Sequence, residues 1–381
     1  MFRICTFMLT ACVAFLQAQP RVLVGTEQLD EIVAKTQGKR VGLLANHTAA
    51  LGHAHLADLL KSLKVNLVKI YAPEHGFRGN VPDGEQIKDG VDPRTGLPVI
   101  SLYGDNKKPT AKQLADVDIV LFDIQDVGTR FYTYISSLHY LMEACAENKK
   151  KVIILDRPNP NGSFIDGPVL KPEFKSFIGM HPIPIAHGMT VGELAQMING
   201  EGWLAGGKKC ELEVITVKYW KHEDPFKLPI APSPNLPNNH AVNLYPYICL
   251  FEGTVMSLGR GTAMPFEVLG HPDLKDQPFE FTPVSIPDKS KYPPLENQKC
   301  FGIDLRNEEP ERKISLKHLI YFYNLFPDKE KFFTPYFDKL AGNAELKEQI
   351  KQGLTEEQIR ETWQKDLEAF KEKRKKYLLY P

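Results

Sequence analysis

The chain has 381 residues, more than one hydrophobic core usually serves, so we expect two domains. Its 47 Lys and Arg residues balance its 47 Asp and Glu residues, and 43% of the chain is hydrophobic, which is typical of a globular protein. Basic residues are spread along the chain except for a short run over 371–376. We therefore expect no nucleic-acid partner, because phosphate binding needs a concentrated basic face.

The N-terminus has the three parts of a secretory signal, namely Arg3, an apolar run over residues 4–16, and the small residue Ala18. This run is too short to remain as a membrane span. We therefore expect residues 1–18 to be a signal peptide and the mature protein to be exported, to a periplasmic or extracellular location. A second interpretation is lipoprotein processing at Cys12, and only then do we expect contact with a membrane.

Four cysteines remain after removal of such a signal, and none belongs to a Cys-x-x-Cys pair. Neither a zinc ribbon nor a thioredoxin-like redox site is indicated. We expect all four to be free and buried: Cys145, Cys210, Cys249 and Cys300.

From residue 40 onward, short β-branched apolar runs alternate with amphipathic stretches. We predict strands over 40–44, 65–71, 99–102, 118–122, 151–155, 183–186 and 211–217. We predict helices over 54–63, 110–115, 132–148 and 191–198. The last of these helices follows a capping box that begins at Thr190. Near-continuous apolar strands separated by helices favour a parallel sheet covered on both faces, in a Rossmann-like, doubly wound α/β domain.

Residues 221–247 differ in composition, with six prolines and several asparagines, which is typical of a connection with little regular structure. We place a domain boundary near its start. The α/β domain then covers 21–225, and a smaller α+β domain over 226–381 closes a cleft against it. In the smaller domain we predict a strand over 301–305 and a charged helix pair over 344–378.

Polar residues directly follow five of the predicted strands. Ligands of open parallel sheets bind outside the carboxyl ends of the strands, so we expect these residues to form one site. They are Asn46 and His47 after the first strand, Glu74 and His75 after the second, Asp123, Asp126 and Arg130 after the fourth, Asp156 and Asn159 after the fifth, and His187 after the sixth.

Structural roles are the alternative for most of these residues. The alternatives are a capped turn for residues 156–161, a turn for Asn46, a core histidine for His187, and an ion-pair network for Asp123, Asp126 and Arg130. A structural role is harder to argue for Glu74. A glutamate directly after a buried strand loses hydration unless it is paired, and such burial is how a carboxyl becomes suited to act as an acid.

Separated carboxylates, a histidine, arginines and many amides suit glycoside hydrolysis, in a chain that lacks nucleotide-binding and nucleophile-elbow motifs. One carboxyl would protonate the leaving oxygen. Another would activate water, attack the anomeric carbon or stabilise the developing cation. Metal-assisted hydrolysis is the rival hypothesis, but the histidine spacing matches no zinc motif, so we expect no metal. A glycan-binding module that is not an enzyme is the third hypothesis.

Seven strings in order carry a family resemblance: VGLLANHTA, YAPEHGFRG, FDIQDVGTRFYTYI, LDRPNPNG, AHGMTVGELA, PSPNLP and LFEGTVMSLGRGT. The chain resembles the exo-β-N-acetylmuramidases of the NamZ type, exported bacterial cell-wall hydrolases, from about residue 40 to its C-terminus. The resemblance implies an active site in a cleft between a Rossmann-like and a smaller domain. It also implies release of N-acetylmuramic acid from non-reducing ends of peptidoglycan fragments, without metal or nucleotide cofactor.

The resemblance also implies residue roles. Glu74 of the PEHG motif is expected to be the general acid, with His75 and Arg78 beside it. Asp126 is the expected second carboxylate, with Asp123 as the alternative. In a further alternative the substrate's own acetamido group is the nucleophile and one of these aspartates orients it.

The remaining expected site residues bind substrate. Arg130 or Arg78 is expected to bind the lactyl carboxylate of the sugar, since a guanidinium binds a carboxylate in bidentate fashion. Tyr132 belongs to the same motif as Arg130. Four residues of the second domain are expected to face the cleft: Ser233, Asn235, Glu252 and Arg260. The alternative function is a cell-wall glycan-binding or amidase-like protein that uses the same cleft.

Overall fold

The structure of the protein is a computed structural model, which describes residues 20–78 and 88–381. The predicted signal peptide over residues 1–18, with Ala18 and the alternative processing site Cys12, lies outside the described residues. Within the described part of the chain, no helix is both long enough and apolar enough to span a membrane.

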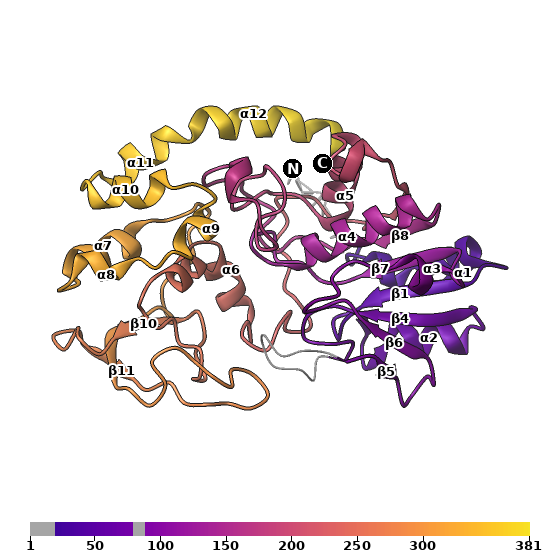
Figure 1. Ribbon diagram of the computed structural model, residues 1–381, viewed down its shortest axis with the longest axis horizontal. Coiled ribbons are helices and arrows are strands. Elements are labelled where there is room, and N and C mark those ends of the chain that lie inside the picture. The colour runs from indigo at the N-terminus through magenta and orange to yellow at the C-terminus, as the bar shows by residue number, and fades with distance from the viewer. Residues whose placement is uncertain (1–19, 79–87) are drawn as a thin grey trace, which may run out of the picture.

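A seven-stranded sheet forms the centre of the N-terminal domain, in the order β5-β6-β4-β1-β7-β8-β9 (Figure 1). Its strands are β1 Val41–Ala45, β4 Leu67–Ala72, β5 Gly90–Val91, β6 Pro98–Ser101, β7 Ile119–Asp123, β8 Lys151–Leu155 and β9 Glu211–Ile215. The edge strand β5 is antiparallel to β6, and all other neighbours are parallel. The six parallel strands follow the 3-2-1-4-5-6 order of the Rossmann fold, which confirms the predicted doubly wound domain.

The central strands are apolar because both of their faces are covered. Leu43 of β1 pairs with Ile70 of β4 and Leu121 of β7, and these three pack with helices α1 (Leu29–Thr36) and α2 (Leu56–Ser62). The alternate residues, such as Leu44 and Phe122, pack with α3 (Ala111–Leu114), α4 (Tyr134–Glu147) and α5 (Val191–Gly200). Successive side chains of a strand point to opposite faces, so each strand supplies both cores.

Two local predictions for this domain are wrong. Residues 183–186 form no strand, since Ala186 makes only isolated bridges to Thr129 and Asp166. The segment from residue 54 begins with a hairpin, β2 (Ala50–Leu51) and β3 (Ala54–His55), and α2 starts only at Leu56.

The capping box of α5 is confirmed. The Thr190 hydroxyl accepts a bond from the Glu193 N–H at 3.2 Å, and the Glu193 carboxylate accepts one from the Thr190 N–H at 2.9 Å. These two bonds satisfy backbone donors that the first turn of a helix leaves unpaired.

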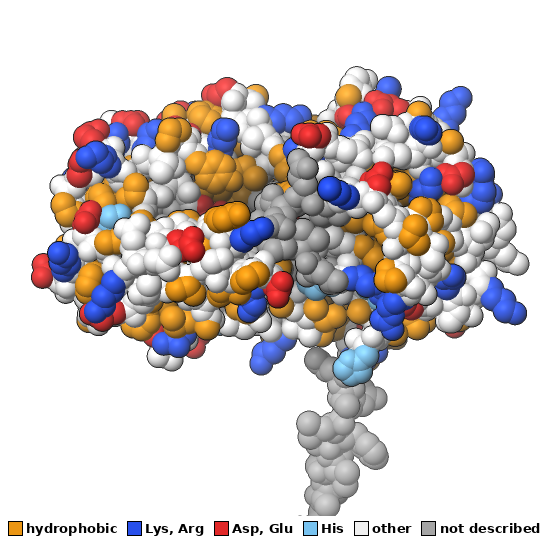
Figure 2. Space-filling model, turned by 60° about the horizontal axis from the view of Figure 1, so that its bottom comes forward, with side chains coloured by type: hydrophobic (Ala, Val, Ile, Leu, Met, Phe, Trp, Pro, Cys, Tyr) orange, Lys and Arg blue, Asp and Glu red, His pale blue; other side chains and the backbone are white. Residues whose placement is uncertain are grey.

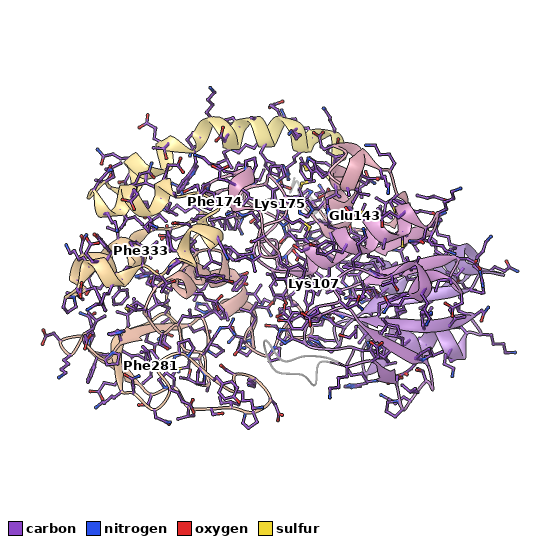
Figure 3. The ribbon with its side chains drawn as sticks, in the orientation of Figure 1. Lys107, Glu143, Phe174, Lys175, Phe281 and Phe333 are labelled. Atoms are coloured by element: carbon purple, nitrogen blue, oxygen red, sulfur yellow. The ribbon has the colours of Figure 1, made fainter. Side chains whose placement is uncertain are left out.

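The second domain is smaller and contains an antiparallel sheet in the order β10-β12-β11. Its elements up to residue 341 are β10 Val268–His271, β11 Phe279–Phe281, β12 Cys300–Asp304, α6 Asn239–Ile248, α7 Lys317–Leu325, α8 Lys329–Phe332 and α9 Phe337–Ala341. Helix α6 lies within the segment predicted to be irregular. Phe281 and Phe333 pack into separate apolar clusters here (Figure 3). The predicted strand near residues 301–305 is confirmed as β12.

Three helices, where a pair was predicted, form the C-terminal segment: α10 Glu345–Lys351, α11 Glu356–Thr362 and α12 Gln364–Arg374. Short 3₁₀ helices occur at Gly25–Glu27, Pro172–Phe174, Ala205–Gly207, Cys249–Gly253 and Lys375–Tyr377. Helix α12 runs from the second domain back to the N-terminal domain, where it ends near α5 (Figure 1). The Tyr377 hydroxyl donates to Glu201 of this region at 2.7 Å.

The surface and the cysteines match the expectations from composition. On the face shown in Figure 2, acidic and basic side chains are interspersed. Cys145, Cys210, Cys249 and Cys300 are all buried and unpaired, as predicted.

Candidate active site

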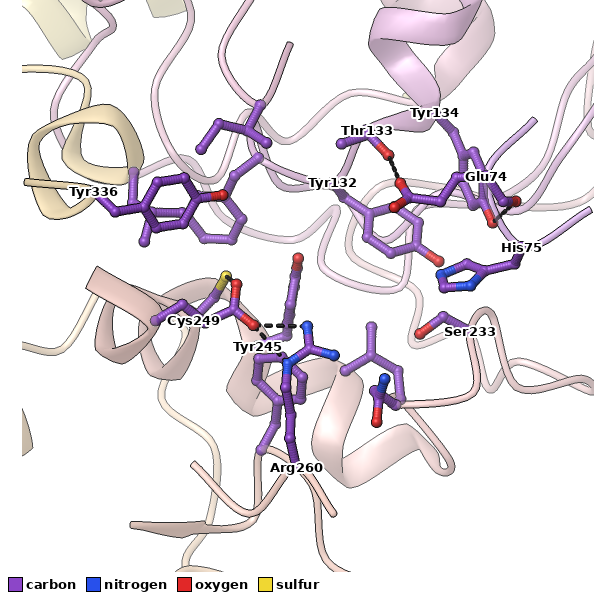
Figure 4. Close-up of a pocket in the computed structure, with 17 residues that line it drawn as sticks. Glu74, His75, Tyr132, Thr133, Tyr134, Ser233, Tyr245, Cys249, Arg260 and Tyr336 are labelled. Atoms are coloured by element: carbon purple, nitrogen blue, oxygen red, sulfur yellow. Dashed lines mark hydrogen bonds and ion pairs between the residues drawn. The ribbon is translucent and has the colours of Figure 1, made fainter. Parts of the chain in front are cut away.

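A cavity of about 220 Å³ lies between the two domains, beyond the carboxyl ends of the strands (Figure 4). Both domains contribute to its wall. The lining residues are Glu74, His75, Phe131, Tyr132, Thr133, Tyr134 and Ile178 from the N-terminal domain, Ser233, Asn235 and Leu236 from the segment that leads to helix α6, and Tyr245, Cys249, Glu252, Arg260, Phe266, Tyr336 and Leu340 from the second domain.

A tight turn after β4 brings Glu74 and His75 into this cavity. The Gly76 N–H donates to the Pro73 carbonyl at 3.0 Å, and both His75 (φ 65°) and Gly76 (φ 78°) have left-handed backbone conformations. Such a conformation is rare for a residue with a side chain and is found most often where a site requires it. In Figure 4 the His75 ring lies next to Ser233.

Two neutral hydroxyls hold the Glu74 carboxyl in place. One oxygen accepts a bond from Tyr103 at 2.6 Å, and the other accepts one from Thr133, the N-cap residue of α4, at 2.7 Å. Within the described part of the chain, Glu74 makes no ion pair. Its orientation is therefore fixed by hydroxyl groups.

The opposite wall carries an ion pair. The Arg260 Nε and Nη2 atoms lie 2.8 and 2.6 Å from one Glu252 oxygen, and the guanidinium stacks 5.2 Å from the centroid of the Phe266 ring. Arg260 is the single Lys or Arg among the described lining residues. The cavity thus places one cation across from the Glu74 carboxyl, as Figure 4 shows.

The remaining polar wall is neutral. The Tyr132 hydroxyl donates to the Pro232 carbonyl at 2.9 Å, and the Asn235 amide donates to the Lys289 carbonyl at 3.1 Å. Burial raises the pKa of the Tyr132 and Tyr245 hydroxyls well above its usual range, so both stay protonated. These groups can hydrogen-bond a polar ligand without adding charge.

Asp123 and three other predicted site residues have structural partners and do not line the cavity. The carboxylate of Asp123 is fully buried and accepts two bonds from Arg157, at 2.6 and 3.1 Å. Asp156 accepts bonds from the Thr190 hydroxyl and the Gly192 N–H. The Asn46 oxygen closes a turn onto Thr48, and the Asn159 oxygen closes one onto Asn161. The turn alternative therefore describes Asn46 and Asn159. Asp123 forms an ion pair with Arg157 and not with Arg130, and Asp156 binds the start of α5 and not its own turn.

Asp126 and His187 form a buried pair outside the cavity. One Asp126 oxygen accepts a bond from the Gly128 N–H at 2.7 Å and lies 4.0 Å from the His187 Nε2 atom. Burial raises the pKa of Asp126 to about 7 and lowers that of His187 to about 3. Asp126 is thus not placed to reach a substrate in the cavity, contrary to the prediction that it is the second carboxylate.

The two arginines predicted to bind the lactyl group are occupied elsewhere. Arg130 is fully buried and donates to four carbonyl oxygens, those of Pro168, Ile183, Leu340 and Ala341. Arg78 pairs with Asp92 at 2.8 Å and with Asp58 at 3.0 Å. Hydrogen bonds to these two carboxylates hold the pKa of Arg78 above its usual range, so it is a permanent structural cation.

Several cavity residues were missed in the sequence. Thr133 and Tyr134 directly follow Tyr132 in the FYTY string, so the motif itself signalled them. Tyr103 does not line the cavity but bonds Glu74, and it directly follows the predicted strand at 99–102, as the strand-end pattern would suggest. Tyr245 and Tyr336 come from a helix and a helix start in the second domain, where no local pattern marked them. Among the described residues, no group of three or more His, Cys, Asp or Glu side chains is placed to hold a metal ion.

Comparison with known families agrees with this architecture. The sequence profile of the N-terminal domain of exo-β-N-acetylmuramidase NamZ matches residues 41–240, and that of the C-terminal domain matches residues 243–380. The chain belongs to the NamZ family. The predicted resemblance is confirmed, and the NamZ match includes both walls of the cavity.

Matches to known relatives extend over nearly the whole of this NamZ chain. The peptidoglycan β-N-acetylmuramidase NamZ of Bacillus subtilis (strain 168) is 39% identical, over 95% of this chain and 92% of its own length. Crystal structures of two DUF1343 family proteins from Bacteroides fragilis NCTC 9343 each cover 95% of this chain. The match to the first includes 99% of that protein's chain, with a TM-score of 0.89 and 45% sequence identity. The match to the second includes 100% of that protein's chain, with a TM-score of 0.82 and 33% sequence identity.

Proposed function

We infer that this protein is an exo-acting glycoside hydrolase that releases N-acetylmuramic acid from the non-reducing ends of peptidoglycan fragments. The observation that carries this inference is the match of both domains to NamZ, together with a relative named peptidoglycan β-N-acetylmuramidase that is 39% identical. The interdomain cavity with Glu74 on its wall supplies an acid for such a reaction.

In the proposed reaction Glu74 donates a proton to the glycosidic oxygen as the bond from this oxygen to the anomeric carbon breaks. A water molecule adds its hydroxyl to the anomeric carbon and its remaining proton restores the acid form of Glu74, so the products are free N-acetylmuramic acid and a shortened glycan. Tyr103 and Thr133 orient the carboxyl through their hydroxyls. The other described carboxyl of the cavity, Glu252, orients Arg260 by accepting its N–H bonds.

Arg260 is our candidate to bind the lactyl carboxylate that distinguishes N-acetylmuramic acid from N-acetylglucosamine. Arg260 is the single Lys or Arg among the described residues that line the cavity. Its ion pair with Glu252 fixes the orientation of its planar guanidinium. A guanidinium matches a carboxylate in geometry as well as charge. This role replaces the one predicted for Arg130 and Arg78.

We also propose that the protein is exported to the periplasm or the cell exterior, where its peptidoglycan substrate lies. The N-terminal signal pattern over residues 1–18 supports this location. Fractionation of cells that express the full chain, with and without a Cys12→Ser substitution, tests it. Loss of membrane association in the variant alone would indicate lipidation, and retention in the cytosol would contradict export.

The decisive experiment compares two substrates with different leaving groups. Glu74→Gln should slow hydrolysis of the disaccharide N-acetylmuramyl-β-1,4-N-acetylglucosamine about 10²- to 10⁴-fold, because the amide cannot donate a proton. The same substitution should slow hydrolysis of the para-nitrophenyl β-glycoside of N-acetylmuramic acid much less, because nitrophenolate leaves without a proton. Glu173→Gln, an exposed Glu outside the cavity, is the matched control.

Other outcomes separate the alternatives. Equal losses on both substrates would remove Glu74 from the role of acid. Release of peptide instead of sugar from peptidoglycan by the wild type would indicate an amidase. No release of either product, with glycan still bound, would indicate a binding protein.

A further inference from the structure

A second cavity lies on another face of helix α6. It measures about 270 Å³, compared with about 220 Å³ for the first. Tyr245 and Cys249, four residues apart on α6 and its continuation, line the first cavity, whereas Asn239 and Asn243 line the second. Residues four apart share a helix face, so α6 is a common wall between two separate cavities.

The floor of the second cavity carries a buried polar atom that lacks a partner among the described residues. His222 is 5% exposed; its Nε2 atom lies 3.0 Å from Glu193, and its Nδ1 atom has no hydrogen-bond partner among the described residues. Asn161, also buried, donates through its amide nitrogen to the carbonyls of Val127 and Val242. A buried polar atom is rarely left without a partner, so the Nδ1 atom of His222 makes the floor suited to hydrogen-bond a ligand.

The rim of the second cavity carries charges of both signs. Four acids and two cations line it, namely Glu223, Asp224, Glu309, Glu311, Lys227 and Arg312, and all but Glu311 are exposed. Within the described residues, Glu311 pairs with Lys313 and the other five form no ion pair. A neutral sugar does not require such groups, but a ligand with separate positive and negative charges can pair with both kinds.

Apolar walls complete the second cavity. Phe164 and Phe226, both half-buried, line it between the polar floor and the charged rim. Most binding pockets combine an apolar wall with a few polar groups that fix the orientation of the ligand. Amide and imidazole groups below, apolar rings at the side and mixed charges above match the chemistry of a short peptide.

We propose that this second cavity binds a short peptide that carries both an ammonium group and free carboxylates, the chemistry of the peptides attached to peptidoglycan. The source of the peptide rests on the proposed function. Binding here would hold the enzyme on a peptide-bearing cell wall while the first cavity receives the end of a glycan. The two cavities would then recognise the two chemical parts of one polymer from opposite sides of α6.

Isothermal titration calorimetry with the full chain tests the proposal. The probe is the free tripeptide L-alanyl-γ-D-glutamyl-L-lysine, and we expect saturable one-to-one binding. The double substitution Lys227→Glu and Arg312→Glu should weaken binding at least tenfold, because it reverses the charges that face the carboxylates. Lys39→Glu, an exposed charge reversal outside both cavities, should leave the affinity unchanged.

Three results would overturn the proposal: no saturation at millimolar peptide, an affinity unchanged by the double substitution, or binding of N,N′-diacetylchitobiose in preference to the peptide. The tripeptide has no glycosidic bond, so its binding is measured independently of hydrolysis. Failure of the peptide experiment therefore leaves the proposed function untouched. Conversely, failure of the disaccharide assay leaves the peptide result valid.

Discussion

At the scale of single residues, Arg260 is our proposed ligand for the lactyl carboxylate that distinguishes the sugars. Its N–H groups bind Glu252 and its plane lies over Phe266, so the cation is oriented before substrate arrives. Arg260→Lys keeps the charge but loses the planar fork of donors. We expect the KM for the para-nitrophenyl N-acetylmuramic acid β-glycoside to rise about tenfold or more, with a smaller change in kcat, since a charge-assisted hydrogen bond contributes about 1.5 to 3 kcal/mol.

Steady-state kinetics at several substrate concentrations measure this change. Arg94→Lys is the matched control, because Arg94 is exposed and lies outside the cavity. An unchanged KM in Arg260→Lys would assign the lactyl carboxylate to another group.

Asp126 gives a prediction about stability and pH. Burial raises its pKa in the folded protein to about 7, above the ordinary value of 3.8. Between about pH 4 and pH 7 the folded state therefore retains a proton that the unfolded state releases, so this residue makes the fold less stable as pH rises. The side chain of the Asp126→Asn variant stays neutral at every pH. We therefore expect its stability relative to wild type to increase by on the order of a few kcal/mol as the pH rises from about 4 to about 8.

Urea unfolding of both proteins at pH 4, 6 and 8 measures this difference. The exposed Asp30→Asn change is the control and should show no such trend. If the difference between Asp126→Asn and wild type does not depend on pH, then burial does not keep Asp126 protonated.

The loops that carry the site follow strands with a clear apolar pattern, but no sequence pattern tells which way each side chain points. Glu74 follows one buried strand and Asp123 ends another, yet Glu74 lines the cavity and Asp123 binds Arg157. That difference depends on an arginine 34 positions away in the sequence, and no local pattern reveals it. Arg130 illustrates the same limit, since the carbonyls that bind it come from residues up to 211 positions away.

At the scale of elements, helix α6 matters because it separates the two cavities. The Asn238 side-chain oxygen caps it by accepting a bond from the Ala241 N–H at 2.8 Å. Asn238→Ala removes this acceptor, and we expect a loss of about 1 kcal/mol in the free energy of unfolding, measured in urea. Asn238→Ser retains a capping oxygen and should restore most of that loss. Equal losses in both variants would show that the bond from Asn238 to Glu267, not the cap, is responsible.

The strands were predicted well because each fully buried parallel strand is a short apolar run with its own signal. The segment at residues 183–186 has the same apolar character but forms no strand. Ile183 and Ile185 are buried, yet their carbonyls bind the side chain and backbone of Arg130 rather than a neighbouring strand. Apolar composition predicts burial, and only long-range pairing distinguishes a strand from a buried loop.

At the scale of the whole molecule, the C-terminus returns to the N-terminal domain and joins the two halves of the chain. The Leu379 N–H donates to Glu193, and the Tyr380 hydroxyl donates to Asp156 at 2.5 Å. The same hydroxyl accepts a bond from the Val217 N–H beside β9 at 3.0 Å. The last residues thus complete the edge of the Rossmann-like domain, although they follow the whole of the second domain in sequence.

Tyr380→Phe tests whether this closure couples the two domains. The substitution leaves the buried Val217 N–H unpaired and removes a donor from Asp156, so we expect the free energy of unfolding to fall by about 1 to 3 kcal/mol. Differential scanning calorimetry should show one transition in wild type and one at lower temperature in the variant, because the N-terminal domain unfolds together with the segment that completes it. Tyr377→Phe, which loses one bond from a less buried hydroxyl to Glu201, should shift the transition less. Two separate transitions in wild type would contradict the coupling, since each half would then be stable without the C-terminal closure.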